Sequence, residues 1–161
     1  MTRIEFTRRV AFVEAPYAVA CLDFDERQKT RNLIVTTAGE TVGVLLERGT
    51  SLKHGDHLES RDGLVLRVEA ALEPISVVRS TSALALARAA YHLGNRHVRL
   101  EIGADYVAYQ ADHVLDEMIE HLGFLLSTEH RAFEPEPGAY AHGEPAHAHS
   151  HAGHHVHHSH G

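Results

Sequence analysis

Histidine is the residue type in this chain with the clearest capacity for chemistry. Sixteen of the 161 residues are histidine, and nine of these lie within the last twenty positions. Imidazole is a good ligand for nickel, zinc and copper, and a histidine-rich tract is a compositional indication of metal binding. The nine candidate ligands of this tail are His142, His147, His149, His151, His154, His155, His157, His158 and His160. The alternative is a solubilising tail whose charge responds to pH. The high density of imidazoles favours metal binding over this alternative.

Two histidines outside the tail are further candidate ligands. His97 follows Gly94 and Asn95, which both tolerate left-handed backbone angles and therefore predict the end of a helix. We expect His97 on the last loop residue before an alternating strand, where backbone on both sides fixes the direction of its ring. His113 is expected on the following helix. Neither has enough neighbouring ligands in one chain to complete a metal shell, whereas a two-fold dimer would duplicate each and bring two His97 rings to one axis.

The elements that position these histidines form the second part of the chain, residues 74–140. Pro74 punctuates a change in pattern, so we place a domain boundary after Glu73. A helix capped by Ser80 or Thr81 carries an apolar stripe at Leu86, Ala89, Ala90 and Leu93. A second helix, capped by Asp112 and ended by Gly123, carries its stripe at Leu115, Met118, Ile119 and Leu122. The strands are predicted over 75–78, 98–102, 106–109 and 124–127. The order β-α-β-β-α-β predicts a ferredoxin-like domain.

The first part of the chain, residues 1–73, predicts a small all-β domain. Short alternating segments such as 64–68 are separated by turn residues, among them Gly55 and Gly63. The charged stretch 23–31 fits either one helical turn or a polar connection. From residue 141 to 161 the composition is dominated by His, Ala, Gly and Ser, which cannot bury a core, so this tail is predicted to be disordered. The fold class is therefore α+β.

Several short motifs give the chain a resemblance to a known family. In chain order they are Arg-Gly-Thr at 48–50, Gly-Asp at 55–56, Gly-Asn-Arg-His at 94–97, Asp-His-Val-Leu-Asp-Glu-Met at 112–118, Leu-Gly at 122–123, Phe-Glu-Pro-Glu at 133–136 and Gly-Ala-Tyr at 138–140. Together they resemble the urease accessory protein UreE family of nickel metallochaperones, and they extend over most of the chain.

The resemblance implies a cytoplasmic, homodimeric carrier of Ni²⁺ rather than an enzyme. It implies that His97 bridges two subunits through the second domain, and that the cargo passes to a maturation complex containing the urease accessory GTPase and apo-urease. His113 corresponds to an auxiliary ligand of some members. Those members have a further histidine where this chain has Ala111, so a surface position without a metal role fits His113 equally well. Zn²⁺ or Cu²⁺ would suit the same ligands.

Composition excludes other classes of protein. The formal net charge is −7 with histidine neutral, and this argues against a nucleic-acid binder. No apolar run approaches the roughly 20 residues that span a membrane. Cys21 is the single cysteine, so no internal disulfide forms, and a buried thiol is the common state of such a residue.

The remaining histidines and carboxylates have structural explanations. His92 and His121 suit the C-terminal ends of helices, His130 is expected in a connection, and His54 and His57 are expected to be solvated turn residues. Glu117 and Glu120 look like an exposed helix face, and no nucleophile or phosphate-binding motif occurs. Two rival functions stay open. One is a metal-buffering protein whose tail sequesters Ni, Zn or Cu without a client enzyme, and the other is a small hydrolase with an incidental tail.

Overall fold

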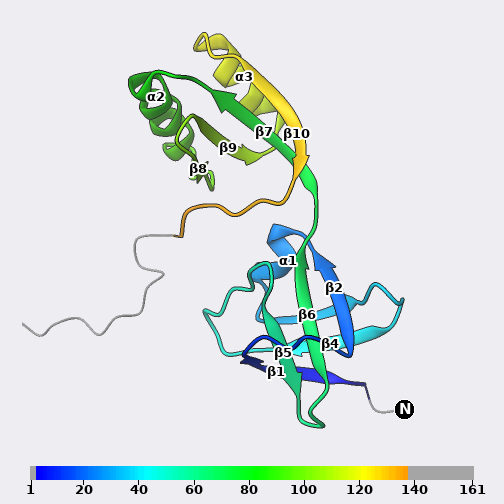
Figure 1. Ribbon diagram of the computed structural model, residues 1–161. Coiled ribbons are helices and arrows are strands. Elements are labelled where there is room, and N and C mark those ends of the chain that lie inside the picture. Colours follow the sequence, from blue (N-terminus) through cyan, green and yellow to red (C-terminus); the bar gives the residue numbers. More distant parts are fainter. Residues whose placement is uncertain (1–2, 138–161) are drawn as a thin grey trace, which may run out of the picture.

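The computed structural model describes residues 3–137, whose strands gather into two sheets, one in each half of the chain (Figure 1). The mixed α+β class is confirmed, with ten strands and three helices in the described residues. The predicted disordered tail, residues 141–161, and its nine candidate ligands lie outside the described residues. Within the described part, no helix is both long and apolar enough to cross a membrane.

The N-terminal unit is a six-stranded sheet. Its elements are β1 (Glu5–Val10), β2 (Ala18–Leu22), α1 (Phe24–Gln28), β3 (Arg31–Val35), β4 (Thr41–Leu45), β5 (His57–Ser60) and β6 (Val65–Ala70). The strand order is β2-β6-β5-β1-β4-β3, in which β1–β4 and β2–β6 are parallel pairs and the other pairs are antiparallel. Alternate residues of these strands, such as Phe6, Val42 and Leu66, are buried in one apolar core. This alternate burial explains why apolar and polar residues alternate along these segments of the sequence.

The charged stretch 23–31 contains the helix α1. Asp23 caps it by accepting from the Glu26 N–H at 2.7 Å, while the Glu26 carboxylate accepts from the Asp23 N–H at 3.1 Å. This reciprocal arrangement is a capping box, and it satisfies two amide groups that a short helix would otherwise leave unpaired. The inward side chains of α1 are Phe24 and Arg27, both buried. The helix therefore points one aromatic ring and one cation away from solvent.

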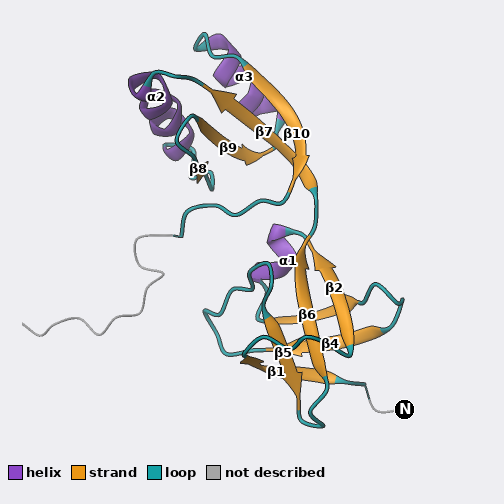
Figure 2. Ribbon diagram, in the orientation of Figure 1, coloured by secondary structure: helices purple, strands orange, loops and turns teal. Residues whose placement is uncertain are grey.

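The C-terminal unit is a four-stranded antiparallel sheet with two helices on one of its faces (Figure 2). Its elements are β7 (Glu73–Arg79), α2 (Ala83–Gly94), β8 (Glu101–Ile102), β9 (Tyr106–Gln110), α3 (His113–His121) and β10 (Leu126–Arg131). The strand order is β10-β7-β9-β8. The predicted helix stripes are confirmed except at Leu122, which follows the last residue of α3 and is not part of the core. Leu86, Ala89, Leu93 and Ile119 are buried in one core with Val78 and Val107 of the sheet.

Some predicted helix ends are confirmed and one is wrong. Asp112 caps α3 by accepting from the Val114 and Leu115 N–H groups, and Gly123 ends it with a φ of 85°. The cap of α2 is Ser82 rather than Ser80 or Thr81, because the Ser82 hydroxyl accepts from the Ala85 N–H at 3.3 Å. Ser80 does not cap the helix. Its backbone N–H donates to the Asp105 carbonyl, next to the sheet.

The predicted strand limits in this unit need correction. The strand expected over 98–102 is only the two-residue β8, because the Leu100 carbonyl accepts from the Glu136 N–H instead of joining the sheet. The strand expected over 124–127 is β10, which reaches Arg131 because it pairs with β7 down to Glu73. His130 therefore lies in a strand opposite Pro74 and not in a connection.

Two side chains of the N-terminal unit also differ from expectation. His57 is 3% exposed, and its Nδ1 lies 2.9 Å from the Gly55 carbonyl oxygen, so it is a buried strand residue rather than a solvated turn residue. Cys21 is exposed rather than buried. It alternates along β2 with buried Ala20 and Leu22, and this places its thiol on the outer face of the sheet.

Candidate metal centre

The loop that carries His97 is held by backbone hydrogen bonds from the end of α2. The Arg96 N–H donates to the Leu93 carbonyl at 2.9 Å, and the His97 N–H donates to the Gly94 carbonyl at 2.9 Å. These bonds extend the helix end as a tighter turn through Asn95, whose φ is −63°. The helix ends on Gly94 as predicted. The left-handed residue is His97 itself, with a φ of 57°, and not Gly94 or Asn95, whose tolerance of this conformation predicted the helix end.

His97 is exposed and lies beside a hollow in the surface. The lining of this His97 hollow comes from three parts of the chain: Phe24 and Asp25 of α1, His97, Val98 and Arg99 of the loop, and Gln110, Ala111, Asp112 and Leu115 around the start of α3. The imidazole therefore has carboxylates from two elements on the same concave surface. A wall from the N-terminal unit is a feature that the sequence did not indicate.

His113 is not among the residues that line the His97 hollow. It is the first residue of α3, and its side chain is exposed. Its chain neighbours Ala111 and Asp112 do line the hollow, so position 111 presents a methyl group there and not an imidazole. The described residues therefore bring His97 together with residues 110–112 but do not bring it together with His113.

A complete metal shell does not form within residues 3–137 of one chain, where no three His, Cys, Asp or Glu side chains converge closely enough to hold an ion. His97 thus offers one imidazole from a fixed backbone. Further ligands for an ion held at His97 would have to come from a second copy of the chain or from residues outside the described part.

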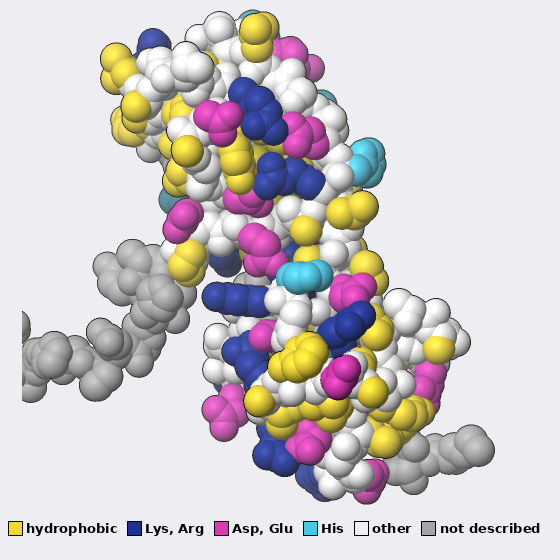
Figure 3. All heavy atoms as spheres, in the orientation of Figure 1, with side chains coloured by type: hydrophobic (Ala, Val, Ile, Leu, Met, Phe, Trp, Pro, Cys, Tyr) yellow, Lys and Arg dark blue, Asp and Glu magenta, His cyan; other side chains and the backbone are white. Residues whose placement is uncertain are grey.

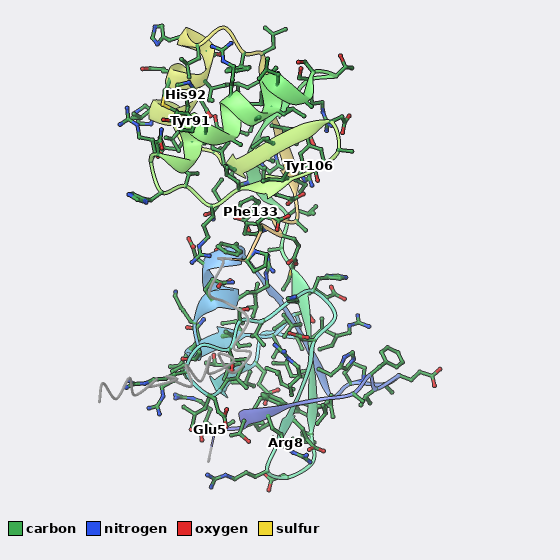
Figure 4. All side chains as sticks on the ribbon, turned by 90° about the vertical axis from the view of Figure 1, so that its left-hand side faces the viewer. Glu5, Arg8, Tyr91, His92, Tyr106 and Phe133 are labelled. Carbon is green, nitrogen blue, oxygen red and sulfur yellow. The ribbon has the colours of Figure 1, made fainter. Side chains whose placement is uncertain are left out.

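The other histidines of the described part have structural surroundings. His92 is half-buried in the last turn of α2, and its ring meets that of Tyr91 edge-on, with the centroids 5.4 Å apart (Figure 4). His121 lies in the last turn of α3, as expected, where it complements the helix dipole. His54 accepts from the Ala70 N–H through Nδ1 at 3.2 Å. None of these three lines the His97 hollow.

The start of α3 is fixed to the sheet by a buried tyrosine. The Tyr109 hydroxyl donates to the Asp116 carboxylate at 2.8 Å, joining β9 to the first turn of α3. Burial, and then this hydrogen bond, raise the pKa of Tyr109 well above the ordinary tyrosine value, so the phenol stays protonated and continues to donate. The bond holds the Asp112 side of the hollow in a constant position relative to the sheet.

The carboxylates considered for catalysis are surface residues. Glu117 and Glu120 are both exposed on α3, as expected for a solvated helix face. The buried carboxylates of the C-terminal unit are instead occupied by fixed partners. Glu73 accepts from the Phe24 N–H at 2.8 Å and from Gln110 Nε2 at 2.9 Å, while Glu101 accepts from Tyr106 and Arg131. These bonds give both groups a structural role.

Comparison with protein families identifies relatives along most of the chain. A family model described as UreE urease accessory protein, C-terminal domain, matches residues 73–160, and one described as UreE urease accessory protein, N-terminal domain, matches residues 16–71. The chain is 48% identical to the urease accessory protein UreE of Alkalilimnicola ehrlichii over 137 residues, covering 85% of this chain and 84% of the relative. The proteins of the same name from Teredinibacter turnerae and Proteus mirabilis are 49% and 47% identical, covering 78% and 79% of this chain and 81% and 79% of theirs.

Proposed function

The chain belongs to the UreE family of urease accessory proteins, and from this membership we propose that it is a metallochaperone that binds Ni²⁺ and delivers it for assembly of the urease metallocentre. Nickel is the cargo in this proposal. The protein holds the ion and transfers it, and it catalyses no reaction. Zn²⁺ or Cu²⁺ would occupy the same imidazoles, since ligand type alone does not select nickel.

The observation that carries the proposal is the geometry of His97. It is an exposed imidazole on a backbone that is fixed by the end of α2, and it lies beside a concave surface. A ligand that is already oriented loses less conformational entropy when the metal binds than a ligand on a flexible segment does. The same geometry supports a homodimer as the binding form, because a two-fold axis near His97 would supply the second imidazole.

The two units have different tasks in this proposal. Residues 74–140 bind metal and form the dimer, and we assign them to the ferredoxin-like class. The order β10-β7-β9-β8 of a β-α-β-β-α-β unit supports that assignment. Residues 1–73 dock a partner, and the tail, residues 141–161, holds additional ions through its nine histidines. The two family models meet near the proposed domain boundary, between residues 71 and 73.

The partners of this carrier are the urease accessory GTPase and apo-urease in a maturation complex, and its location is the cytoplasm. His113 is at most an auxiliary ligand, because it lies outside the lining of the His97 hollow. The rival function, a metal buffer without a client, is favoured by one observation, the nine histidines in the last twenty residues.

Calorimetry with Ni²⁺ on three variants tests the proposal. His97→Ala should abolish the tightest binding event, one per dimer, while the protein stays folded and dimeric. Deletion of residues 141–161 should lower the number of bound ions and leave at least one per dimer. His113→Ala should have a smaller effect than His97→Ala. Loss of all binding on tail deletion, or tight binding that survives His97→Ala in the tail-deleted protein, would refute the ordered site.

Delivery and buffering are separated in cells that are limited for nickel. A carrier with a client predicts that His97→Ala reduces urease activation, because the transferred ion is the one bound at the ordered site. A buffer predicts that tail deletion alone changes the nickel content of the cell and that urease activation follows total nickel, whatever residue occupies position 97.

A further inference from the structure

We infer that Arg27, a residue of the N-terminal unit, is a positioning residue for His97 in the C-terminal unit. It acts by holding the strap, defined as residues 133–136, against the loop that carries His97. The inference concerns metal binding at His97 and in that respect rests on the proposed function. The strap contacts themselves are independent of that function.

Arg27 crosses the junction of the two units as a buried cation. Its side chain is 1% exposed. Nη1 donates to the Glu134 carboxylate at 2.8 Å, and Nη2 donates to the Phe133 carbonyl oxygen at 2.6 Å. Figure 3 shows basic and acidic side chains next to each other at this junction. A buried guanidinium is stable only where such acceptors surround it, so Arg27 and the strap hold each other in place.

The strap in turn holds the loop of His97. The Glu136 N–H donates to the Leu100 carbonyl at 2.7 Å, three residues after His97. The Glu134 N–H donates to the Glu101 carboxylate at 2.9 Å, at the start of β8. The loop between α2 and β8 is therefore fixed at its far end by the strap, just as it is fixed at its near end by the turn that follows α2.

The helix α1, which contains Arg27, also contacts the loop that carries His97. Two guanidinium groups lie over the ring of Phe24, with Arg27 Cζ 5.7 Å and Arg99 Cζ 5.6 Å from the ring centre. Phe24 also meets Phe133 of the strap edge-on, with the ring centroids 5.3 Å apart. Since Phe24 and Asp25 line the His97 hollow, a shift of α1 would move one wall of the hollow and one anchor of the loop together.

Arginine is required at this position for a geometric reason. One planar guanidinium reaches the side chain of Glu134 and the backbone of Phe133 at the same time, whereas a lysine ammonium has a single centre of charge on a different stem. Arg27→Lys should therefore keep the charge and lose part of the positioning. Arg27→Met, which has a similar apolar stem, should lose all of it.

The experiment uses the full-length chain and two measurements. Hydrogen exchange should show faster exchange of the Glu136 amide in Arg27→Met, because the strap that carries this amide is no longer held against the Leu100 carbonyl. Calorimetry with Ni²⁺ should show the tightest event weakened about 10-fold, the scale on which outer residues that orient a ligand affect metal affinity. Arg27→Lys should give intermediate values for both.

Arg8→Met is the matched control. Arg8 pairs with Glu59 within the N-terminal unit and is largely exposed. In Figure 4 it lies at the end of that unit opposite Phe133, which marks the junction. This variant removes an arginine of the same unit from an ion pair, and neither measurement should change. If Arg27→Met does not fold, Glu134→Gln replaces it, because Glu134 is 45% exposed and the amide weakens the pair without leaving a void.

Each outcome supports the inference or overturns it. It is overturned if exchange at Glu136 is unchanged in Arg27→Met, or if exchange rises while the tightest nickel event stays the same. It is also overturned if Arg27→Met weakens nickel binding equally in a His97→Ala background, since the effect then does not pass through His97. If His97→Ala alone leaves the tightest event intact, the proposed function fails instead, and this result is distinct from any result of the Arg27 variants.

Discussion

At the scale of single residues, His97 is held in a backbone conformation that costs free energy. Its φ of 57° is left-handed, and no other non-glycine residue among residues 3–137 has a positive φ. Such a conformation costs about 1–2 kcal/mol for a residue with a side chain. The turn that follows α2 and the bond from Glu136 to Leu100 hold the loop in this form. Strained residues tend to persist where the surrounding structure determines them, and they often lie at functional sites.

Replacement of His97 by glycine should therefore leave the fold at least as stable as before. Relief of the left-handed strain is offset in part by the larger entropy of glycine in the unfolded chain, so the net gain should be at most about 1 kcal/mol. Urea denaturation measures it. Ala87→Gly is the matched control, because Ala87 is exposed inside α2 and glycine there should cost about 1 kcal/mol. An equal loss in both variants would show that position 97 is not strained.

The local sequence predicted the helix end at Gly94 but not the residue that turns left-handed. Gly94 and Asn95 are the residue types that tolerate this conformation best, yet Asn95 stays right-handed with a φ of −63°. Two hydrogen bonds of the 3₁₀ type, each between residues three apart, continue the turn through Arg96, so the chain reverses direction only at His97. Whether the chain continues the helix for a short turn or reverses direction at once depends on the loop that follows the helix. Residue preference alone does not decide it.

At the scale of elements, the hydrogen bond from Tyr109 to Asp116 that joins β9 to α3 is sensitive to alkaline pH. The pKa of Tyr109 is raised in the folded state by burial and by the hydrogen bond to Asp116. The unfolded chain loses the tyrosine proton near its ordinary pKa of about 10, while the folded state retains it. The contribution of Tyr109 to stability is therefore complete below about pH 10 and decreases as the pH rises above that value.

Tyr109→Phe should separate this contribution from the rest of the fold. At neutral pH the variant should lose about 1 kcal/mol, the value of one hydrogen bond, and its stability should fall less steeply than that of the parent above about pH 10. Thermal denaturation across pH 7–11 measures both effects. Tyr91→Phe provides the comparison, because Tyr91 is exposed and forms no side-chain hydrogen bond with the described residues. Parallel pH profiles for Tyr109→Phe and the parent would contradict the assignment.

Helices were more predictable than strands, for a physical reason that β8 and β10 illustrate. The stripes of α2 and α3 follow from local spacing, and Asp112 and Gly123 mark the ends of α3 by local chemistry. Val98 and Leu100 alternate as a strand does, but the strap takes the Leu100 carbonyl. β10 extends to Arg131 because β7 offers partners down to Glu73. Strand limits depend on such distant partners, which a local pattern does not contain.

At the scale of the whole molecule, the two units share an apolar cluster. Phe24 of α1 packs with Phe133 and with Ile75, Val77 and Ala108 on the face of the C-terminal sheet that the helices leave open. The sequence predicted two units from the change of pattern at Pro74. It did not predict this contact, because Phe24 lies within a charged stretch in which apolar residues do not recur at the spacing of a helix or a strand. The contribution of α1 to the His97 hollow was missed for the same reason, although the capping pair Asp23 and Glu26 is a local sign of the helix.

The shared cluster leads to a prediction about the separated C-terminal unit. Residues 73–161 should fold alone, because α2, α3 and the sheet enclose a core of their own that contains Leu93, Val107 and Ile119. This fragment should nevertheless be less stable than the same residues in the whole chain, since Ile75, Val77 and Phe133 lose the cover of Phe24. The expected loss is about 1.5–3 kcal/mol, the value of burying one phenylalanine side chain. Circular dichroism tests folding, and hydrogen exchange of the β7 amides compares the two stabilities.

Phe24→Ala in the full-length chain should reproduce the part of the loss that comes from the ring, because it removes the same ring and keeps the connection and the hydrogen bonds of Arg27 to residues 133 and 134. Phe12→Ala is the control. Phe12 is 76% exposed in the same unit, so its removal should leave exchange in β7 unchanged. An unfolded fragment would show that the division into two units is wrong. A fragment as stable as the whole chain would show that the units are independent and that the contact through Phe24 contributes nothing, and the hollow beside His97 would then lack a fixed wall on the side of α1.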